Sequence, residues 1–141
     1  MADKLILQIH VSIREEDKTE FFGPTGGVIF IPFSGTAEGE IFHGTVRPGA
    51  VDCQRVNAAG VKHMCAKYVL EGTDKAGKPC CIFIENNGWY AGEVPDGFVT
   101  VPTLFTDSEA LAPYLHRAAF RGKGERCPGG VTISIYEIEG A

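Results

Sequence analysis

The segments that decide the fold are "VKHMCAKYVLEG" at residues 61–72 and "KPCCIFIENNGWY" at residues 78–90. Both contain the β-branched, aromatic and aliphatic residues that are typical of strands. They flank "TDKAG" at residues 73–77, a short connection that ends in glycine. A connection of this length and composition is typical of a β-hairpin. The sequence therefore predicts two antiparallel strands joined directly to each other.

Strand-like segments continue on both sides of this hairpin. The segment "KLILQIHVSI" at residues 4–13 alternates, which predicts that Leu5, Leu7, Ile9 and Val11 share one face. Further strands are predicted at residues 27–33, 36–47, 50–60, 98–106 (kinked at Pro102), 114–126 and 129–140. In the strand at 50–60, Asp52 and Gln54 are expected on one face because side chains alternate along a strand.

Two stretches interrupt the strand pattern. Residues 14–27, "REEDKTEFFGPTGG", predict an exposed, charged turn region. Residues 107–113 contain the only helix-start signal, because Asp107 is placed to cap one helical turn that ends before Pro113. We therefore expect at most one short helix.

These elements predict an all-β fold. Eight to ten short strands separated by turns, without a long amphipathic helix, are typical of a sandwich or a barrel. We expect a single antiparallel β-barrel, closed or nearly closed, of about eight to ten short strands. The 141 residues fit one domain that spans residues 1–141.

Composition and charge exclude several classes of protein. The net charge is −5, and 13 basic residues are interspersed with 18 acidic ones, so we expect no nucleic-acid partner. No apolar stretch approaches the ~20 residues that cross a bilayer, and the N-terminus lacks a basic start followed by a long apolar block. We therefore expect no membrane association and a cytoplasmic location.

Cysteine usage agrees with a reducing compartment. The five cysteines are an odd number and form no C-x-x-C motif, so a disulfide framework is not expected. The group His63, Met64 and Cys65 is too small to predict a metal site. We expect free thiols and neither a metal nor a cofactor.

Three segments carry a resemblance to a known family. They are "GTAEGEIFHGTVRPGAVDCQRV", "AKYVLEGTDKAGKPCCIFIENNG" and "YLHRAAFRGKG", in this order. Their order and spacing resemble the bacterial and fungal family known as domain of unknown function 3237, over most of the chain from Gly35 to Ile138. The resemblance implies a small antiparallel β-barrel, often dimeric, with a pocket of unassigned chemistry. We therefore expect a homodimer or a higher homo-oligomer.

The sequence lacks the motifs of several enzyme classes. It contains no G-x-S-x-G elbow, P-loop, dinucleotide fingerprint or H-E-x-x-H helix. Acid–base chemistry in a barrel mouth remains, because polar side chains inside apolar strands tend to have shifted proton affinities. We predict His116, Asp52 and Tyr68 as catalytic residues. The predicted substrate-binding residues are Gln54, Asn86, His43 and Glu85.

Most of these candidates also have a structural interpretation. Asp52 and Asn86 are equally well explained as turn residues, and Tyr68 as a core aromatic residue with its hydroxyl at the rim. Glu85 is expected in solvent beside lysines if it does not face the pocket, and the two orientations of His43 are equally plausible. His116 is the best single titrating candidate because imidazole exchanges protons near neutral pH.

Two function classes stay open from the sequence. The first is a cofactor-independent isomerase, cyclase or lyase that moves a proton on a small aromatic or carbonyl-containing metabolite. In this hypothesis His116 or Asp52 is the base. The second is a non-catalytic β-barrel that binds a small hydrophobic ligand.

Overall fold

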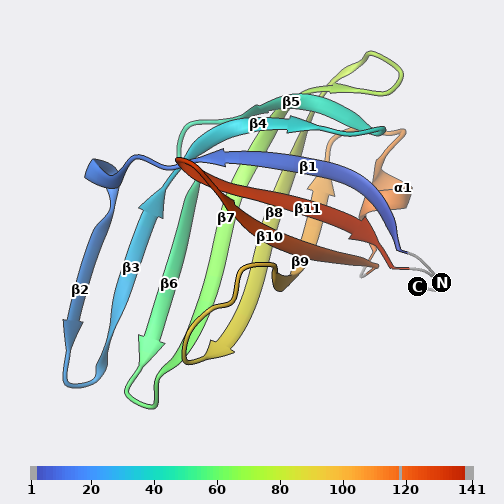
Figure 1. The fold of residues 1–141 in the computed structure, drawn as a ribbon. Helices are drawn as coiled ribbons and strands as arrows, with labels where there is room; N and C mark the ends of the chain where they lie inside the picture. Colours follow the sequence, from blue (N-terminus) through green and yellow to red (C-terminus); the bar gives the residue numbers. More distant parts are fainter. Residues whose placement is uncertain (1–2, 118, 139–141) are drawn as a thin grey trace.

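The computed structural model describes residues 3–117 and 119–138; positions 1, 2, 118 and 139–141 of the predicted domain lie outside them. Eleven strands in the described residues form one antiparallel sheet (Figure 1). The strands are β1 (Lys4–Ser12), β2 (Thr19–Gly23), β3 (Gly26–Pro32), β4 (Ser34–Glu38), β5 (Phe42–Val46), β6 (Val51–Asn57), β7 (Val61–Asp74), β8 (Pro79–Ala91), β9 (Phe98–Thr106), β10 (Phe120–Cys127) and β11 (Gly130–Glu137). A short helix, α1 (Ala112–Leu115), and a 3₁₀ turn, η1 (Glu15–Asp17), accompany them.

Strand β7 closes the barrel. It pairs with β8 over nearly its whole length, while its residues 62–67 pair with β6 and residues 70–74 pair with β5. Eight strands therefore form a closed circuit in the order β7, β5, β4, β1, β11, β10, β9, β8 and back to β7. Strands β6, β3 and β2 continue the sheet outside this circuit and lie on the left in Figure 1. We call these three strands the wing.

The predicted all-β antiparallel barrel and its β7–β8 hairpin are confirmed. The strand number is slightly higher than expected, for two reasons. The strand predicted at residues 36–47 is two strands, because the chain reverses after Glu38 and β4 pairs with β5. The segment predicted as an exposed turn at residues 14–27 contains β2, which pairs with β3. Every residue of β2 is exposed, so its sequence shows no buried face.

The strand predicted at residues 114–126 is wrong in its first half. Residues 112–115 form α1, and the strand begins at Phe120. Pro113 lies inside the first helical turn, where its missing N–H leaves no hydrogen bond unmade. The predicted cap and the predicted end before Pro113 are also wrong, because α1 begins after Leu111, whose side chain makes no capping hydrogen bond, and it includes Pro113. Ser108 Oγ accepts the Leu111 N–H at 3.2 Å, whereas the Asp107 carboxylate accepts the Cys81 N–H.

The alternation predicted in β1 changes at a register shift between Leu5 and Leu7. This irregularity leaves Leu5 exposed and buries both Ile6 and Leu7. From Leu7 onward the predicted face is correct, because Ile9 and Val11 are buried. A β-bulge of this kind is invisible to a strict period of two.

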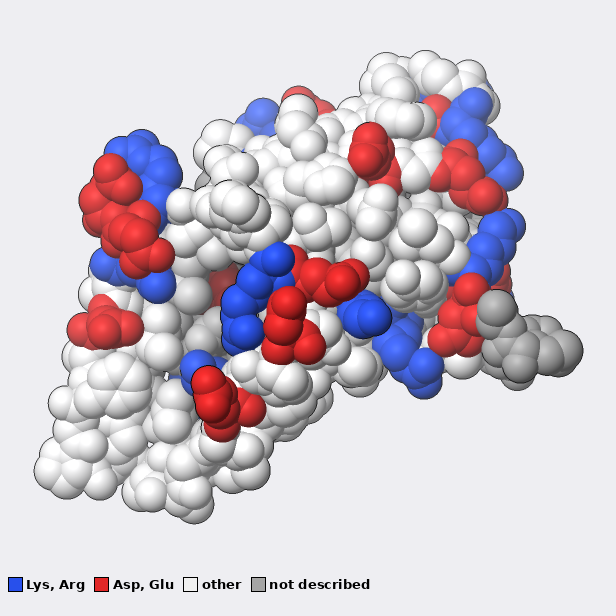
Figure 2. Space-filling view, in the orientation of Figure 1, with Lys and Arg blue, Asp and Glu red and all other residues white. Residues whose placement is uncertain are grey.

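The core fills the closed barrel. Phe42, Leu70, Ile82, Ile84 and Ile135 are among its fully buried side chains. The surface in Figure 2 carries acidic and basic side chains in mixture, while the lower end of the wing is largely uncharged. Phe21, Phe22 and Phe30 of the wing are exposed, so the wing adds apolar surface to a barrel that has its own core.

One close strand contact predicts a large effect of a single methyl group. Gly72 on β7 lies opposite Gly44 on β5, and a Cβ at Gly72 would lie 1.9 Å from the backbone oxygen of His43. We expect Gly72→Ala to lower the free energy of unfolding by about 1–3 kcal/mol in urea denaturation, because backbone must move to admit the methyl group. Gly23→Ala is the control, since no heavy atom lies within 4 Å of its added Cβ. Equal stabilities of the two variants would contradict this packing.

Candidate functional site

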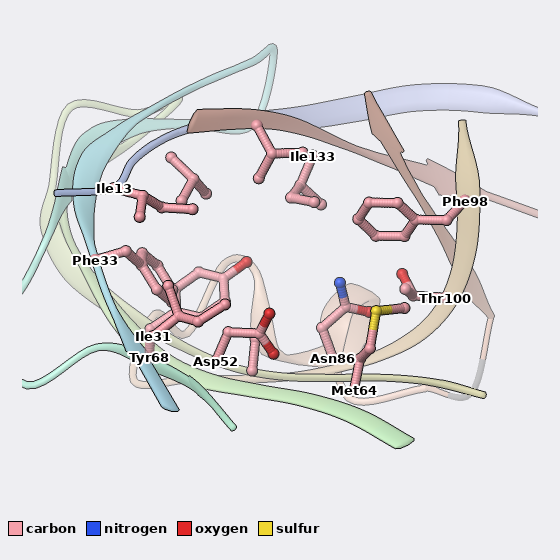
Figure 3. Close-up of a pocket in the computed structure, with 13 residues that line it drawn as sticks. Ile13, Ile31, Phe33, Asp52, Met64, Tyr68, Asn86, Phe98, Thr100 and Ile133 are labelled. Carbon is pink, nitrogen blue, oxygen red and sulfur yellow. The ribbon is translucent and has the colours of Figure 1, made fainter. Parts of the chain in front are cut away.

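A cavity of about 60 Å³ is lined by residues of β1, β7, β8, β9 and β11 of the barrel and of β3 and β6 of the wing. Its lining is largely apolar: Val11, Ile13, Ile31, Phe33, Met64, Ala66, Phe98, Val131 and Ile133. The polar lining residues are Asp52, Tyr68, Asn86 and Thr100. In Figure 3 these four side chains lie along one side of the space, with Ile13 and Ile133 across from them.

Strand register places the polar residues on one inner face. Asp52 on β6 lies opposite Ala66 on β7, and Ala66 lies opposite Asn86 on β8. Residues that are opposite each other in an antiparallel sheet point to the same face. The methyl group of Ala66 therefore separates the carboxylate from the amide and leaves space between them.

The other two polar residues follow from the period of two. Tyr68 is two residues beyond Ala66 on β7 and so shares its face. Thr100 is two residues before Pro102, which lies opposite Asn86. A Cβ at Gly122 on β10 would lie 2.2 Å from Thr100 Oγ1, so the absence of a side chain at position 122 makes room for this hydroxyl.

These four residues contain unpartnered polar atoms. Among the described residues, the buried side-chain oxygens without a hydrogen-bond partner are Asp52 Oδ1, Tyr68 OH, Asn86 Oδ1 and Thr100 Oγ1. All four belong to the lining of this one cavity. A buried polar atom without a partner costs about 1–3 kcal/mol. Their concentration in one apolar cavity is the composition typical of a small-molecule site.

Asp52 is the ionisable group of the cavity. Gln54 Nε2 donates a hydrogen bond to Asp52 Oδ2 at 2.8 Å, which leaves Oδ1 directed to the cavity without a partner. Burial raises the pKa of Asp52 above its ordinary value, while the Gln54 hydrogen bond and the charge of Lys62 oppose this increase. The carboxylate is therefore a stronger base than a solvent-exposed aspartate.

Tyr68 supplies a neutral phenol. Burial, with a smaller contribution from the Asp52 carboxylate, raises the pKa of Tyr68 above its ordinary value. Its ring packs edge-on against Phe33, with 5.2 Å between ring centroids. The hydroxyl is therefore a fixed hydrogen-bond donor at neutral pH.

The structure brings together four of the predicted site residues. Asp52, Tyr68 and Asn86 line the cavity, and Gln54 holds the Asp52 carboxylate. The interpretation of Asn86 as a turn residue is wrong, because it is buried in the middle of β8. Tyr68 is buried, as a core aromatic residue is, but its hydroxyl faces the cavity.

His116 lies elsewhere, and its predicted position on a late strand beside Asp52 is wrong. It follows α1, where its Nε2 accepts the Thr106 backbone N–H at 3.0 Å. Its ring stacks on Phe105, with 4.1 Å between ring centroids. The residue is absent from the cavity lining because the segment before β10 forms a helix instead of a strand.

His43 and Glu85 are also outside the cavity. His43 is exposed on β5 and borders a separate hollow with Glu38 and Glu40. Glu85 lies on the opposite face of β8 from Asn86, where its carboxylate is 3.9 Å from the Lys67 ammonium. The solvent-facing alternative is therefore correct for Glu85.

Sequence reasoning missed Thr100. Its signal was present, because Thr100, Pro102 and Leu104 form the buried face of β9 while Val99 and Val101 are exposed. A threonine on the buried face of an alternating strand is a polar residue at an inward position. Because the two valines are exposed and the threonine is buried, hydrophobicity alone indicates the wrong face of β9 as the buried one.

Other site types receive no support from the geometry of residues 3–117 and 119–138. No group of three or more His, Cys, Asp or Glu side chains in these residues is arranged to hold a metal ion. All five cysteines are free. The helices in this part of the chain are too short or too polar to cross a bilayer.

Comparison with known families now adds to this geometry. The family model described as "Protein of unknown function (DUF3237)" matches residues 3–138. The chain belongs to this family. A UPF0311 protein of Clostridium acetobutylicum is 30% identical over 122 residues, which cover 74% of this chain and 73% of that protein.

Solved structures share the fold of this DUF3237 member. A protein of unknown function from Clostridium acetobutylicum has a TM-score of 0.79 and 27% identity, covering 99% of this chain and 100% of that chain. A conserved protein of unknown function from Rhodopseudomonas palustris has a TM-score of 0.72 and 25% identity, with 96% of each chain covered. A β-barrel-like protein from Acinetobacter baumannii has a TM-score of 0.74 and 18% identity, covering 96% of this chain and 94% of that chain, and shows the fold alone.

Proposed function

We propose that the protein is a cofactor-independent enzyme that moves a proton on a small aromatic or carbonyl-containing molecule. The observation that carries this proposal is the set of four unpartnered polar atoms around one apolar cavity, with a carboxylate among them. A base, a phenol, a hydroxyl and an amide are the minimal groups for enolisation. Isomerases, cyclases and lyases of carbonyl compounds begin with this step.

Each group has a defined role in the proposed reaction. Asp52 Oδ1 removes a proton from the carbon beside the substrate carbonyl, and the electron pair of the C–H bond moves to the carbonyl oxygen. The hydroxyls of Tyr68 and Thr100 and the Nδ2 amide group of Asn86 donate hydrogen bonds to that oxygen as it becomes negative, whereas Asn86 Oδ1 can only accept a hydrogen bond. The Asp52 carboxylic acid then returns the proton to another carbon, or a leaving group departs.

The apolar lining supports a second candidate, a non-catalytic barrel that binds a small hydrophobic ligand. Nine of the 13 described residues that line the cavity are apolar, and a mainly apolar lining with a few polar groups is usual in small-molecule sites. Such a protein needs the same cavity and hydrogen-bond donors but no base. Turnover therefore separates the two candidates.

Deuterium uptake in heavy water tests the proposal. We expect the protein to accelerate exchange at the carbons beside the carbonyl of benzylacetone or indanone, as measured by proton NMR. Ala66→Leu should abolish this acceleration, because the larger side chain fills the space between Asp52 and Asn86. Ala91→Leu is the matched control, since Ala91 is exposed on β8.

The outcomes separate the candidates. The non-catalytic barrel is favoured if the ligand shifts the NMR signals of Thr100 and Asn86 but its deuterium exchange is no faster than in buffer. If Ala66→Leu is folded, as its thermal unfolding will show, and still catalyses deuterium exchange at the wild-type rate, the cavity is not the catalytic site.

A further inference from the structure

The cavity continues into a wider mouth of about 260 Å³. Asp52, Met64 and Phe98 are among the residues that line both spaces. The residues Gln54, Lys62, Val94, Arg126 and Gly130 line the mouth but not the inner cavity. Two of these are basic, whereas Asp52 is the only acidic residue among the described residues that line either space.

Strand register directs both basic residues to this mouth. Lys62 is two residues before Met64 on β7, and Arg126 is two residues after Gly124 on β10, which lies opposite Phe98. Each is therefore on the inner face of its strand and one step nearer to the open end. On the face drawn in Figure 2, basic and acidic side chains lie beside the hollow between the wing and the barrel.

Neither basic side chain forms an ion pair with a carboxylate in the described part of the chain. Lys62 is half-buried and lowers the pKa of Asp52 through its charge, but no carboxylate oxygen of residues 3–117 or 119–138 lies within 4.0 Å of its ammonium. Arg126 donates from Nη2 to the Val94 carbonyl at 2.8 Å, and its backbone N–H donates to Asp96 Oδ1. The remaining guanidinium N–H groups are available to a ligand.

We propose that the mouth binds an anionic group of the ligand, such as a carboxylate, through Lys62 and Arg126 while the apolar body of the ligand occupies the cavity. This inference rests on the proposed function and adds the substrate class: an amphipathic organic acid with a carbonyl group near its apolar end. The planar guanidinium and the ammonium are the two side chains that bind carboxylates most strongly. Asp52, on the inner side of the mouth, excludes the anionic group from the cavity itself by charge repulsion.

Paired probes of the same shape test this inference. Hydrocinnamate and its neutral amide differ in charge at one end, and both are titrated into the isotopically labelled protein at neutral pH and followed by NMR. We expect the carboxylate to bind about tenfold more tightly than the amide. Raising the salt concentration from roughly 50 to 500 mM should weaken the binding of hydrocinnamate but not that of the amide, because salt screens exposed charges.

Variants assign the preference to the mouth. Lys62→Gln and Arg126→Gln should each lower the affinity for hydrocinnamate about fivefold and leave the affinity for the amide unchanged. Lys123→Gln is the matched control, because Lys123 is exposed on the outer face of β10. The amide also reports the integrity of the cavity in each variant.

Equal binding of the two probes by the wild-type protein would overturn this inference alone, since the cavity would still accept a ligand. The inference would also be overturned if Lys62→Gln lost affinity equally for both probes. The same holds if Lys123→Gln lost as much affinity for hydrocinnamate as Lys62→Gln does. If neither probe binds in the cavity, the inference is overturned and the proposed function is contradicted as well.

Discussion

Asp52→Asn is expected to lower the rate of deuterium exchange about 10²- to 10⁴-fold, the usual effect of removing a general base. The amide preserves the shape of the carboxyl group and still accepts a hydrogen bond from Gln54 Nε2, but it removes the negative oxygen Oδ1 that takes the proton. The measurement is the exchange rate of benzylacetone or indanone at saturating concentration. Ligand affinity should change little, because the apolar lining is retained.

The same substitution is expected to stabilise the protein at neutral pH. Burial raises the pKa of Asp52 in the folded state above its value in the unfolded state, so the ionised carboxylate is less stable in the folded protein. The wild type therefore loses stability as the pH rises from below the ordinary aspartate pKa through the folded pKa. Asp52→Asn avoids this loss, and we expect about 1–2 kcal/mol more stability at neutral pH, with a smaller difference in acid.

Glu85→Gln provides the control for both effects of Asp52→Asn. Glu85 is a carboxylate on β8, two strands away from Asp52 on β6, and it points to the opposite face of the sheet beside Lys67. Its amide variant should retain the exchange rate and change the stability by less than about 0.5 kcal/mol. Full exchange activity in Asp52→Asn would remove Asp52 as the base. A fall in its melting temperature at neutral pH would contradict the cost assigned to the buried carboxylate.

Phe42→Ala is expected to lower the free energy of unfolding by about 3–5 kcal/mol, as found for large-to-small changes in closed cores. Phe42 is completely buried on β5, and its ring packs over Gly44, where an added Cβ would lie 2.8 Å from the ring. The loss is a large part of the roughly 5–15 kcal/mol that stabilises a typical domain. Urea denaturation followed by circular dichroism measures it.

Phe21→Ala is the matched control in the wing. The Phe21 side chain is 64% exposed, so its truncation should cost less than about 0.5 kcal/mol. A comparable loss at both positions would mean that the wing is as essential to the fold as the closed barrel. The contrast therefore tests whether stability resides in the eight-strand circuit.

Part of the candidate site could be predicted from local sequence. Alternation alone placed Asp52 and Gln54 on one face, and the register confirms this because Asp52 lies opposite Ala66 and Gln54 opposite Met64. The position of His116 does not follow from local sequence. Its neighbours are compatible with a strand, but a single turn of helix around Pro113 moves its imidazole to the Thr106 backbone N–H.

The sequence by itself determined the all-β class, the β7–β8 hairpin and the shared face of Asp52 and Gln54 on β6, because each depends on residues that are near one another in the chain. Only the tertiary structure decided which strands close the barrel. Strand β7 exchanges β6 for β5 along its length, and β1 pairs with β11 at the other end of the chain. The four polar residues lie on consecutive, paired strands from β6 to β9, whereas barrel closure brings Val11 on β1 and Ile133 on β11 into the same cavity. Local periodicity carries no information on such long-range pairings, so the enclosed cavity around the four polar residues forms only when the sheet is closed.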